Sequence, residues 1–408
     1  MAPKSVKSSN VPNLRFPGFS DPWIKAKLGD IAEKINSGKT PLGGESNYLT
    51  EGVLFVRSQN VNNDRLELEN IVYISENVNA GMKNSVVRAN DILLNITGAS
   101  LGRSCVVPED FEKGNVNQHV CIIRPRKQYN PRFIQPILGS TRGQAIFESL
   151  QTGSGREGLN FDSIKKIELD FPSLPEQEKI ADFLSLIDRR IQTQNKIIQR
   201  LETLIKGLSE KLFSRKIRFE KFTDEWGLKC LNDILVRFEE TTTINNQYPI
   251  LTSARTGLYF QKDYFDGNEV ASKDNTGYNI VPRNYFTYRH MSDDITFKFN
   301  INTICDKGIV STLYPVFTTV GVNDYFLKTY LNEGQIFKNY ALLQKQGGSR
   351  TYMYFNTLIK FKLPFPSLTE QNKISQFLLS IDAKIQTEKN LLDKYQSQKQ
   401  YLLQNLFI

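Results

Sequence analysis

The sequence is poor in residues that bind metals or form disulfides, since its 408 residues include only four cysteines and two histidines. The cysteines stand far apart and form no C-x-x-C pair, which excludes the usual zinc sites, because those sites need clustered ligands. We expect the cysteines to be small buried hydrophobic residues instead. The six residues are Cys105, Cys121, Cys230, Cys305, His119 and His290.

Long apolar runs are also missing. No stretch is long enough to cross a bilayer, and the charged start MAPKSVKSSNVPNLRF resembles neither a signal peptide nor a transit peptide. We therefore expect a cytoplasmic protein. With 52 Lys and Arg against 43 Asp and Glu, the net charge is +9, which favours a polyanionic partner such as nucleic acid without deciding it.

The motifs of several enzyme classes are absent. Residues 37–40 (SGKT) resemble a P-loop, but that motif needs a glycine where Glu33 stands. The sequence has no N-P-P-Y or D-P-P-Y tetrapeptide of amino-methyltransferases, and no glycine-rich turn for S-adenosylmethionine. It has no Glu-x-Lys of restriction nucleases, and its one Asp-x-Lys, from Asp382 to Lys384, falls in an expected helix. These absences favour a binding protein over an enzyme.

A long segment of the chain occurs twice. Residues 171–213 return as residues 365–407 at an offset of 194 without a gap, and 18 of the 43 aligned positions are identical. A second match aligns residues 15–31 with residues 218–234 at an offset of 203, and the only two tryptophans coincide. Between the matches the two halves barely resemble each other, and the second is nine residues shorter (203 − 194). Similar frames around unlike contents indicate one task performed twice on different targets.

Each repeat is predicted to be one long helix. Ser173 and Ser367 stand three residues before Glu176 and Glu370, which is the capping-box spacing that satisfies free N–H groups at a helix start. At about 1.5 Å per residue, the first helix would be about 57 Å long.

Apolar residues follow at alternating steps of four and three in both repeats, which predicts a coiled-coil seam. The partner is either the other repeat of this chain or a second molecule. Gln194, Glu388 and Lys399 interrupt the series, and such polar residues can fix the register of two helices at some cost in stability. The predicted seam consists of Ile180, Leu184, Ile187, Ile191, Ile198, Leu201, Ile205, Leu208, Leu212, Ile374, Leu378, Ile381, Ile385, Leu392, Leu402 and Leu406.

The segments between the matches are predicted to be mixed β-strand and loop, with helices late in each. The runs VLFVRSQNV, DILLNITG and HVCIIRP in the first, and YFTYRHM, ITFKFNI and STLYPVF in the second, are typical of short strands bounded by turn residues. PRFIQPILGS and QIFKNYALL are typical of helices. The predicted division is an N-terminal segment (1–22), a first α/β module (23–170), a helical repeat (171–217), a second α/β module (218–364) and a second helical repeat (365–408).

Polar loops of the two modules contain the candidates for reading base edges. Arginine suits guanine, and asparagine and glutamine suit adenine, because each can form two parallel hydrogen bonds to that base. A Gly-Ser-Arg loop, which occurs in both modules, lets backbone amides approach a phosphate. The alternative is that these residues make turns or are solvated. The candidates are Arg57, Ser58, Gln59, Asn60, Asn117, Gln118, His119, Ser154, Arg156, Arg289, His290, Gly348, Ser349 and Arg350.

The chain resembles the specificity (S) subunits of type I restriction–modification systems. The resemblance rests on RFPGFSDPW, DILLNITGASLGRSCVVP and NVNQHVCIIRP in the first half, on IVPRNYFTYRHMSDDITFKFN and GIVSTLYPVF in the second, and on the E-Q-x-K-I-x-x-F-L-x-x-I-D signature, which occurs twice. It spans essentially the whole chain.

The resemblance implies an α+β fold in which two mixed α/β target-recognition domains are separated by two long helices forming an antiparallel coiled coil. Each domain would read one half of a split, asymmetric double-stranded DNA site, and the helices would set the gap. Two methyltransferase subunits and two restriction (motor–nuclease) subunits would complete the complex. S-adenosylmethionine, ATP and Mg²⁺ would bind those partners, with no cofactor on this chain. A self-contained DNA methyltransferase or nuclease, and a coiled-coil scaffold without a nucleic-acid role, remain as alternatives.

Overall fold

The computed structural model describes residues 11–408 apart from 63, 152–157, 268–269 and 346–349. The chain divides into two compact units. Unit 1 comprises Met1–Asn195 and Asn390–Ile408, and unit 2 comprises Lys196–Lys389. The division crosses both repeats, so that each unit contains one α/β module and a part of each long helix.

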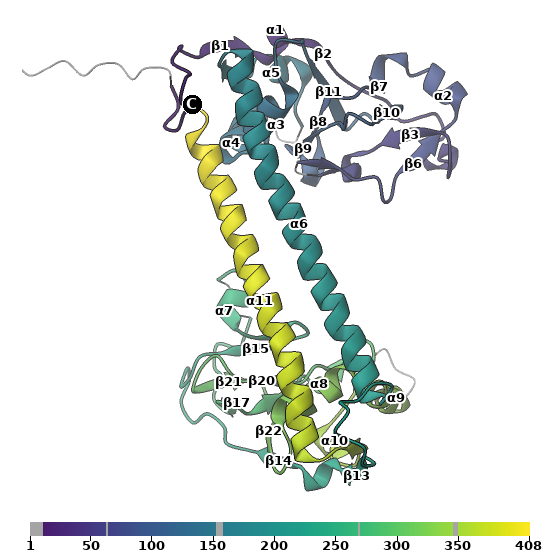
Figure 1. The fold of residues 1–408 in the computed structure, drawn as a ribbon, viewed down its shortest axis with the longest axis vertical. Coiled ribbons are helices and arrows are strands. Elements are labelled where there is room, and N and C mark those ends of the chain that lie inside the picture. The colour runs from purple at the N-terminus through teal and green to yellow at the C-terminus, as the bar shows by residue number, and fades with distance from the viewer. Residues whose placement is uncertain (1–10, 63, 152–157, 268–269, 346–349) are drawn as a thin grey trace, which may run out of the picture. The chain divides into compact units, whose positions relative to one another are not determined.

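The two repeats form the long helices α6 (Leu174–Phe213) and α11 (Leu368–Asn405). In unit 1 the start of α6 shares a core with the end of α11, and in unit 2 the end of α6 shares a core with the start of α11, so the helices are antiparallel (Figure 1). All 16 predicted seam residues are buried or half-buried. The coiled-coil prediction is confirmed, and the partner of each repeat is the other repeat. The shared cores include Leu184, Ile187, Leu402 and Leu406 in unit 1, and Leu212, Ile374 and Leu378 in unit 2.

The glutamate of the repeated signature anchors the start of each long helix to an arginine of the other repeated segment, residues 15–31 or 218–234. The Glu176 carboxylate accepts two hydrogen bonds from the Arg15 guanidinium, both of 2.8 Å, and Glu370 accepts the same pair from Arg218 at 2.9 and 2.8 Å. The capping-box prediction is therefore wrong for the glutamates, although the Ser367 hydroxyl does accept from the N–H of Glu370. The carboxylates bind the arginines because a bidentate ion pair with arginine is stronger than a hydrogen bond to a neutral N–H group.

The neighbouring glutamine attaches each module's helix. The N–H of Asn130, the N-cap of α3 (Pro131–Gly139), donates to Gln177 Oε1 at 2.9 Å. The N–H of Asn323, the N-cap of α8 (Asp324–Glu333), donates to Gln371 Oε1 at 3.0 Å.

The lysine and the phenylalanine of the signature both contact the ring of a second phenylalanine, which lies outside the signature. Phe183 lies edge-on to Phe16 with Lys179 over the same ring, and Phe377, Phe219 and Lys373 repeat this arrangement in unit 2.

Each module also has a short strand pair beside its long helices. The strand β1 (Ile24–Lys27) pairs with β12 (Glu168–Phe171), and β13 (Gly227–Cys230) pairs with β24 (Lys362–Phe365), in both cases antiparallel and in the same register. The two tryptophans, Trp23 and Trp226, are buried next to these strands. Each lies against a phenylalanine of a helix later in the same module, Phe133 in α3 and Phe326 in α8.

A four-stranded antiparallel sheet with the same strand order forms the centre of each module: β2-β11-β8-β9 in unit 1 and β14-β22-β18-β20 in unit 2. The starts of β2 and β14 are 203 residues apart, whereas those of β8 and β18 are 194 apart. The nine-residue difference therefore lies between these strands. Their bounds are β2 Ala32–Ser37, β8 Ile92–Asn95, β9 Ser104–Val106, β11 Val120–Pro125, β14 Leu235–Phe238, β18 Phe286–Thr287, β20 Asn300–Ile301 and β22 Val316–Thr319.

The segment that differs in length forms different structures in the two modules. In unit 1 it contributes most of a second sheet of order β6-β3-β10-β7 and the hairpin β4–β5, and in unit 2 it contributes to the two-stranded sheets β15-β16 and β17-β21. These strands are β3 Val53–Val56, β4 Val61–Asn62, β5 Arg65–Leu66, β6 Val72–Ile74, β7 Val86–Val87, β10 Gly114–Val116, β15 Leu251–Ala254, β16 Gly257–Phe260, β17 Asn279–Pro282 and β21 Lys307–Val310.

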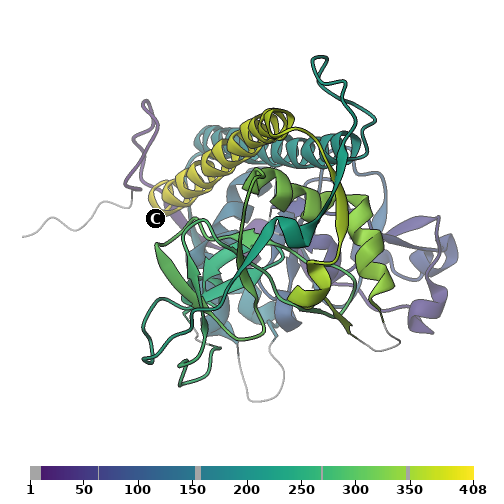
Figure 2. The same ribbon diagram turned by 90° about the horizontal axis from the view of Figure 1, so that it is seen from below.

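Within each unit, helices of the module share a core with the adjoining parts of the long helices, which Figure 2 shows from below. The remaining helices are α1 Leu28–Ile31, α2 Glu76–Ala80, α4 Thr141–Leu150, α5 Phe161–Lys165, α7 Gln261–Tyr264, α9 Gln335–Leu343 and α10 Phe355–Leu358, and the pair β19 Met291–Ser292 with β23 Thr351–Tyr352 completes unit 2.

Most of the strands and helices expected in the modules are present, but ITFKFNI contributes only the two residues of β20. Cys105 and Cys121 are buried as predicted, whereas Cys230 and Cys305 are only half-buried, so the prediction is wrong for that pair. Gly38, in the rejected P-loop match, has a packing role. A Cβ there would lie 1.6 Å from the carbonyl oxygen of Val116, so only glycine fits.

Candidate nucleic-acid interface

The polar side chains at one end of the central sheet in unit 1 form a connected group, which we call the first rim: Thr40, Thr97, Gln118 and His119. The Thr97 hydroxyl lies 2.6 Å from His119 Nδ1, and the Gln118 amide nitrogen lies 2.9 Å from His119 Nε2. The Thr40 hydroxyl donates to the other end of the Gln118 amide. Gln118 is exposed and His119 half-buried, so both can meet a ligand, whereas the predicted Asn117 is buried under the loop.

The second predicted cluster of unit 1, residues 57–60, lies directly beside the first rim. The N–H of Asn117 donates to the carbonyl of Val56, and the Asn95 amide donates to the carbonyl of Ser58. Gln59 is exposed, and Arg57 and Ser58 are half-exposed. Asn60 is buried, with its amide bonded to the backbone of Arg57 and Glu67, and therefore shapes the loop. The structure thus brings the two predicted clusters together.

The corresponding surface of unit 2, which we call the second rim, consists of Arg289, His290, Arg350, Tyr352 and Tyr354. The rings of Tyr352 and Tyr354 are stacked at 5.6 Å, and the His290 ring lies 4.9 Å from that of Tyr354. Tyr352 is 39% and Tyr354 53% exposed. Burial lowers the pKa of His290 below its ordinary value, so this imidazole is neutral at pH 7.

Charged groups surround the second rim. Arg350 pairs with Asp293 at 3.0 Å, and Arg255 pairs with Asp294 at 2.9 Å. Burial raises the pKa of Asp294, but the N–H of Thr296 and the Arg255 guanidinium bind the carboxylate and lower its pKa to about 2. All four charged side chains are well exposed, so these pairs are weak and a phosphate can compete for the arginines.

The two rims occupy equivalent places in their modules, because the same backbone hydrogen bonds form at an offset of 194. In each module the backbone of one residue, Ile96 or His290, takes part in two such bonds. Its carbonyl accepts from a residue that follows the Gly-Ser-Arg segment in the sequence, and its N–H donates to a residue shortly before strand β11 or β22. The bonds are Leu159 N to Ile96 O and Ile96 N to His119 O in unit 1, and Met353 N to His290 O and His290 N to Leu313 O in unit 2. The predicted residues Ser154, Arg156, Gly348 and Ser349 lie outside the described residues.

Comparison with known proteins agrees with this architecture. Residues 20–203 match the family model described as the type I restriction modification DNA specificity domain. The MjaVIII specificity subunit of Methanocaldococcus jannaschii is 24% identical over 359 residues, which cover 79% of each chain. The EcoBI specificity subunit of Escherichia coli is 26% identical over 181 residues, which cover 44% of this chain and 37% of that subunit.

The structure of this chain matches that of the S subunit of a type I restriction–modification system from M. genitalium with a TM-score of 0.56 and 16% sequence identity. The match covers 98% of this chain and 99% of that chain and shows a similar fold. The chain is thus similar to the specificity subunits of type I restriction–modification systems. We call the two modules the first and second recognition domains, after the function proposed below.

Sequence reasoning missed four residues of the two rims: Thr40, Thr97, Tyr352 and Tyr354. The threonines gave no signal, because their partners are distant in the chain. The tyrosines gave one, since the run TYMY follows directly on the second Gly-Ser-Arg loop and alternates aromatic residues toward one face.

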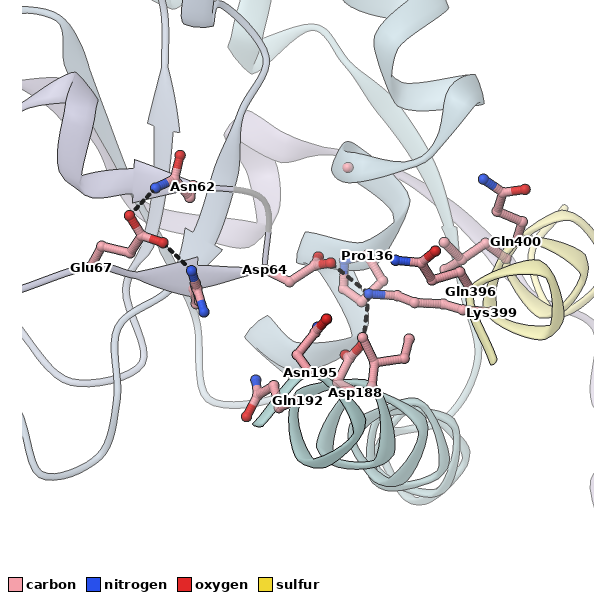
Figure 3. A pocket seen from close by; sticks show the side chains of 14 residues that line it. Asn62, Asp64, Glu67, Pro136, Asp188, Gln192, Asn195, Gln396, Lys399 and Gln400 are labelled. Atoms are coloured by element: carbon pink, nitrogen blue, oxygen red, sulfur yellow. Dashed lines mark hydrogen bonds and ion pairs between the residues drawn. The ribbon is translucent and has the colours of Figure 1, made fainter. Parts of the chain in front are cut away.

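A cavity lies in unit 1, between the hairpin β4–β5 and the two long helices (Figure 3). Its volume is about 820 Å³, and its lining is rich in amides and charged groups, among them Asn62, Asp64, Asp188, Gln396 and Lys399. The part of the chain that the structure describes has no cluster of three or more metal-ligand residues placed to hold an ion. Within that same part, no helix is both long and apolar enough to cross a membrane.

Proposed function

We propose that this chain is the DNA-recognition subunit of a type I restriction–modification complex, and that each recognition domain reads one half of a bipartite, asymmetric site through its rim. The observation that carries the proposal is the pair of equivalent rims with unlike chemistry, amide and imidazole groups in the first and aromatic and arginine groups in the second. Equivalent placement suits one repeated task, and unlike side chains suit two different half-sites. The excess of nine positive charges supports attraction to the phosphate backbone.

The rest of the assembly follows from this division of labour. The chain is a non-catalytic component, and two methyltransferase and two restriction subunits supply the chemistry. Those partners bind S-adenosylmethionine, ATP and Mg²⁺. Residues 23–170 and 218–364 serve as the recognition domains, and residues 171–217 and 365–408 as the helical frame that docks the methyltransferases and sets the gap between half-sites. The complex acts in the cytoplasm.

A domain exchange tests the proposal. Residues 23–170 are replaced by the corresponding domain of a related specificity subunit, the chain is expressed with its partner subunits, and methylated positions in cellular DNA are mapped. One half of the target changes and the other half stays. A change in both halves, or S-adenosylmethionine binding or DNA cleavage by the purified chain alone, contradicts the proposal.

The length of the frame gives a second test. Deleting seven residues from each repeat keeps the seam in register and shortens each helix by about 10 Å, at about 1.5 Å per residue. Since DNA rises about 34 Å per turn of about 10 base pairs, the gap should shorten by about three base pairs or activity should be lost. An active variant with an unchanged gap rules out the helices as a ruler.

A further inference from the structure

Lys399, one of the polar residues that interrupt the predicted seam, lies between two carboxylates. Its Nζ is 2.6 Å from Asp188 of α6 and 2.5 Å from Asp64 of the first recognition domain (Figure 3). Only 13% of the lysine side chain is exposed. A seam residue whose only role was the register of two helices would contact the other helix alone. Lys399 also reaches a third element, the hairpin β4–β5.

Asp64 is held in one orientation at the turn of this hairpin. It adopts a positive φ of 71°, which is uncommon for a residue other than glycine. Its N–H donates to the carbonyl of Ser104 at 3.1 Å, and its second carboxylate oxygen accepts from the Gln135 amide at 3.0 Å. Gln135 is buried and also donates to the carbonyl of Ser104. The carboxylate that meets Lys399 is therefore fixed from the domain side.

The ion pairs of Lys399 suit a role in orienting the hairpin better than a role in stabilising the fold. Burial alone lowers the pKa of Lys399, but the carboxylates of Asp64 and Asp188 raise it above its ordinary value, so the ammonium keeps its charge. The cost of removing ionic groups from water offsets most of their mutual attraction. Apolar side chains of similar size therefore often stabilise a protein equally well. An ionic group that adds little net stability can still select one arrangement of the parts that it joins.

Unit 2 uses the same aspartate with different chemistry. At the offset of 194, Asp188 corresponds to Asp382, whereas Lys399 corresponds to Ile205. Asp382 accepts a hydrogen bond from the Tyr325 hydroxyl at the start of α8. The repeated aspartate thus contacts the recognition domain directly in unit 2, whereas in unit 1 it is linked to the hairpin through Lys399.

We infer that Lys399 is a positioning residue of the first recognition domain, which holds the hairpin β4–β5 against the long helices and thereby orients the predicted base-reading segment 57–60. The hairpin and this segment are joined directly, because the N–H of Glu67 donates to the carbonyl of Asn60 at 2.8 Å and the Asn60 amide returns to the carbonyl of Glu67. The role in DNA recognition rests on the proposed function. The bridge from Lys399 to Asp64, which we call the tether, does not depend on that function.

The test compares Lys399→Met with Lys389→Met in the full chain. Methionine keeps the length of the lysine stem and removes the charge. Lys389 is the matched control, because it is a lysine of the same helix that also pairs with a carboxylate of α6, that of Glu202. Both side chains of this pair are nearly half exposed. Hydrogen exchange is measured at the amides of Asp64 and Glu67. We expect exchange at these two amides to become about tenfold faster in Lys399→Met, while the amides of unit 2 keep their rates. The control variant should change neither.

The DNA arm uses the complex with its partner subunits. We expect Lys399→Met to relax discrimination at the first half-site by about tenfold and to leave the second half-site unchanged, because only the first domain loses its tether. Asp64→Asn, which keeps the shape of the side chain, should give the same pattern. Unchanged exchange at the hairpin overturns the inference, and so does equal acceleration in both units, which indicates general destabilisation. Faster exchange at the hairpin without a half-site effect limits the tether to the hairpin and overturns its role in recognition. If the wild-type complex shows no bipartite site, the proposed function fails while the exchange result still decides the tether.

Discussion

The two recognition domains have the same frame and different rims. Both attach to the long helices through an arginine–glutamate pair, a glutamine on the N-cap of a helix and a buried tryptophan, and both have a central sheet of the same strand order. Their rims share only backbone geometry. The first presents Gln118 and His119, and the second presents His290 between arginines and stacked tyrosines.

This difference shows which parts of the chain are constrained by packing. Frame residues are buried and touch one another, so a change in one disturbs several partners. Rim side chains are exposed or half-exposed, so exchanging them disturbs fewer packed partners. A duplicated domain can therefore acquire a new target without losing its attachment to the helices.

The largest expected effect tests whether the two frames are equivalent. Arg15→Ala and Arg218→Ala each leave a buried carboxylate without its partner, since Glu176 is 1% and Glu370 3% exposed. Each substitution should lower the free energy of unfolding by about 3–5 kcal/mol. Urea unfolding of the full chain measures it. The control Lys113→Ala, which breaks an exposed pair with Glu76, should cost under about 1 kcal/mol. A large loss in only one arginine variant would show that the frames differ.

The next effect tests the aromatic chemistry of the second rim. Tyr352→Ala combined with Tyr354→Ala removes the exposed stacked rings, and truncating an aromatic residue that dominates a binding interface costs about 2 kcal/mol or more. We expect the assembled complex to lose about tenfold to hundredfold in methylation at the second half-site, with the first half-site unchanged. The double phenylalanine variant keeps the rings and should retain most of the activity. Full activity of the double alanine variant would exclude a role of these rings in DNA binding.

The amide chemistry of the first rim should give a smaller effect. Gln118→Ala removes one exposed amide that can form two hydrogen bonds to a base, which is worth about 1–3 kcal/mol of discrimination. Methylation should relax at one base of the first half-site, with the second half-site unchanged. Gln199→Ala, at an exposed position of α6, is the control and should leave both half-sites as they are. Relaxation at the second half-site instead would reverse our assignment of rims to half-sites.

The smallest effect concerns the pKa of His290. Because burial lowers this pKa below the ordinary value, the unfolded chain takes up a proton before the folded chain does as the pH falls. The contribution to stability is therefore present above about pH 6.5, the ordinary pKa of histidine, and is lost as the pH falls through the folded pKa. Tyr354→Ala exposes the imidazole and should raise its midpoint in an NMR titration toward the ordinary value. An unchanged midpoint would show that Tyr354 does not shield the ring.

Several features were predictable because they are local in the sequence. The steps of four and three place one face of each helix in the core, and all of the predicted seam residues are at least half-buried. The two offsets of 194 and 203 predicted a shared frame and a nine-residue difference. Strand runs such as DILLNITG and HVCIIRP also correspond to strands, β8 and β11.

Contacts between distant residues decided the rest. The sequence by itself determined the long helices, their seam and the duplication, since each depends on periodicity or self-similarity along the chain. Only the tertiary structure decided that Glu176 binds Arg15 instead of its own helix start, and that Asn60 and Asn117 are buried beside exposed neighbours. It also decided that Lys399 reaches Asp64, 335 residues away. Such pairings depend on how the sheet, the hairpin and the helices converge, and a carboxylate or an ammonium group gives no local signal of which partner it will meet.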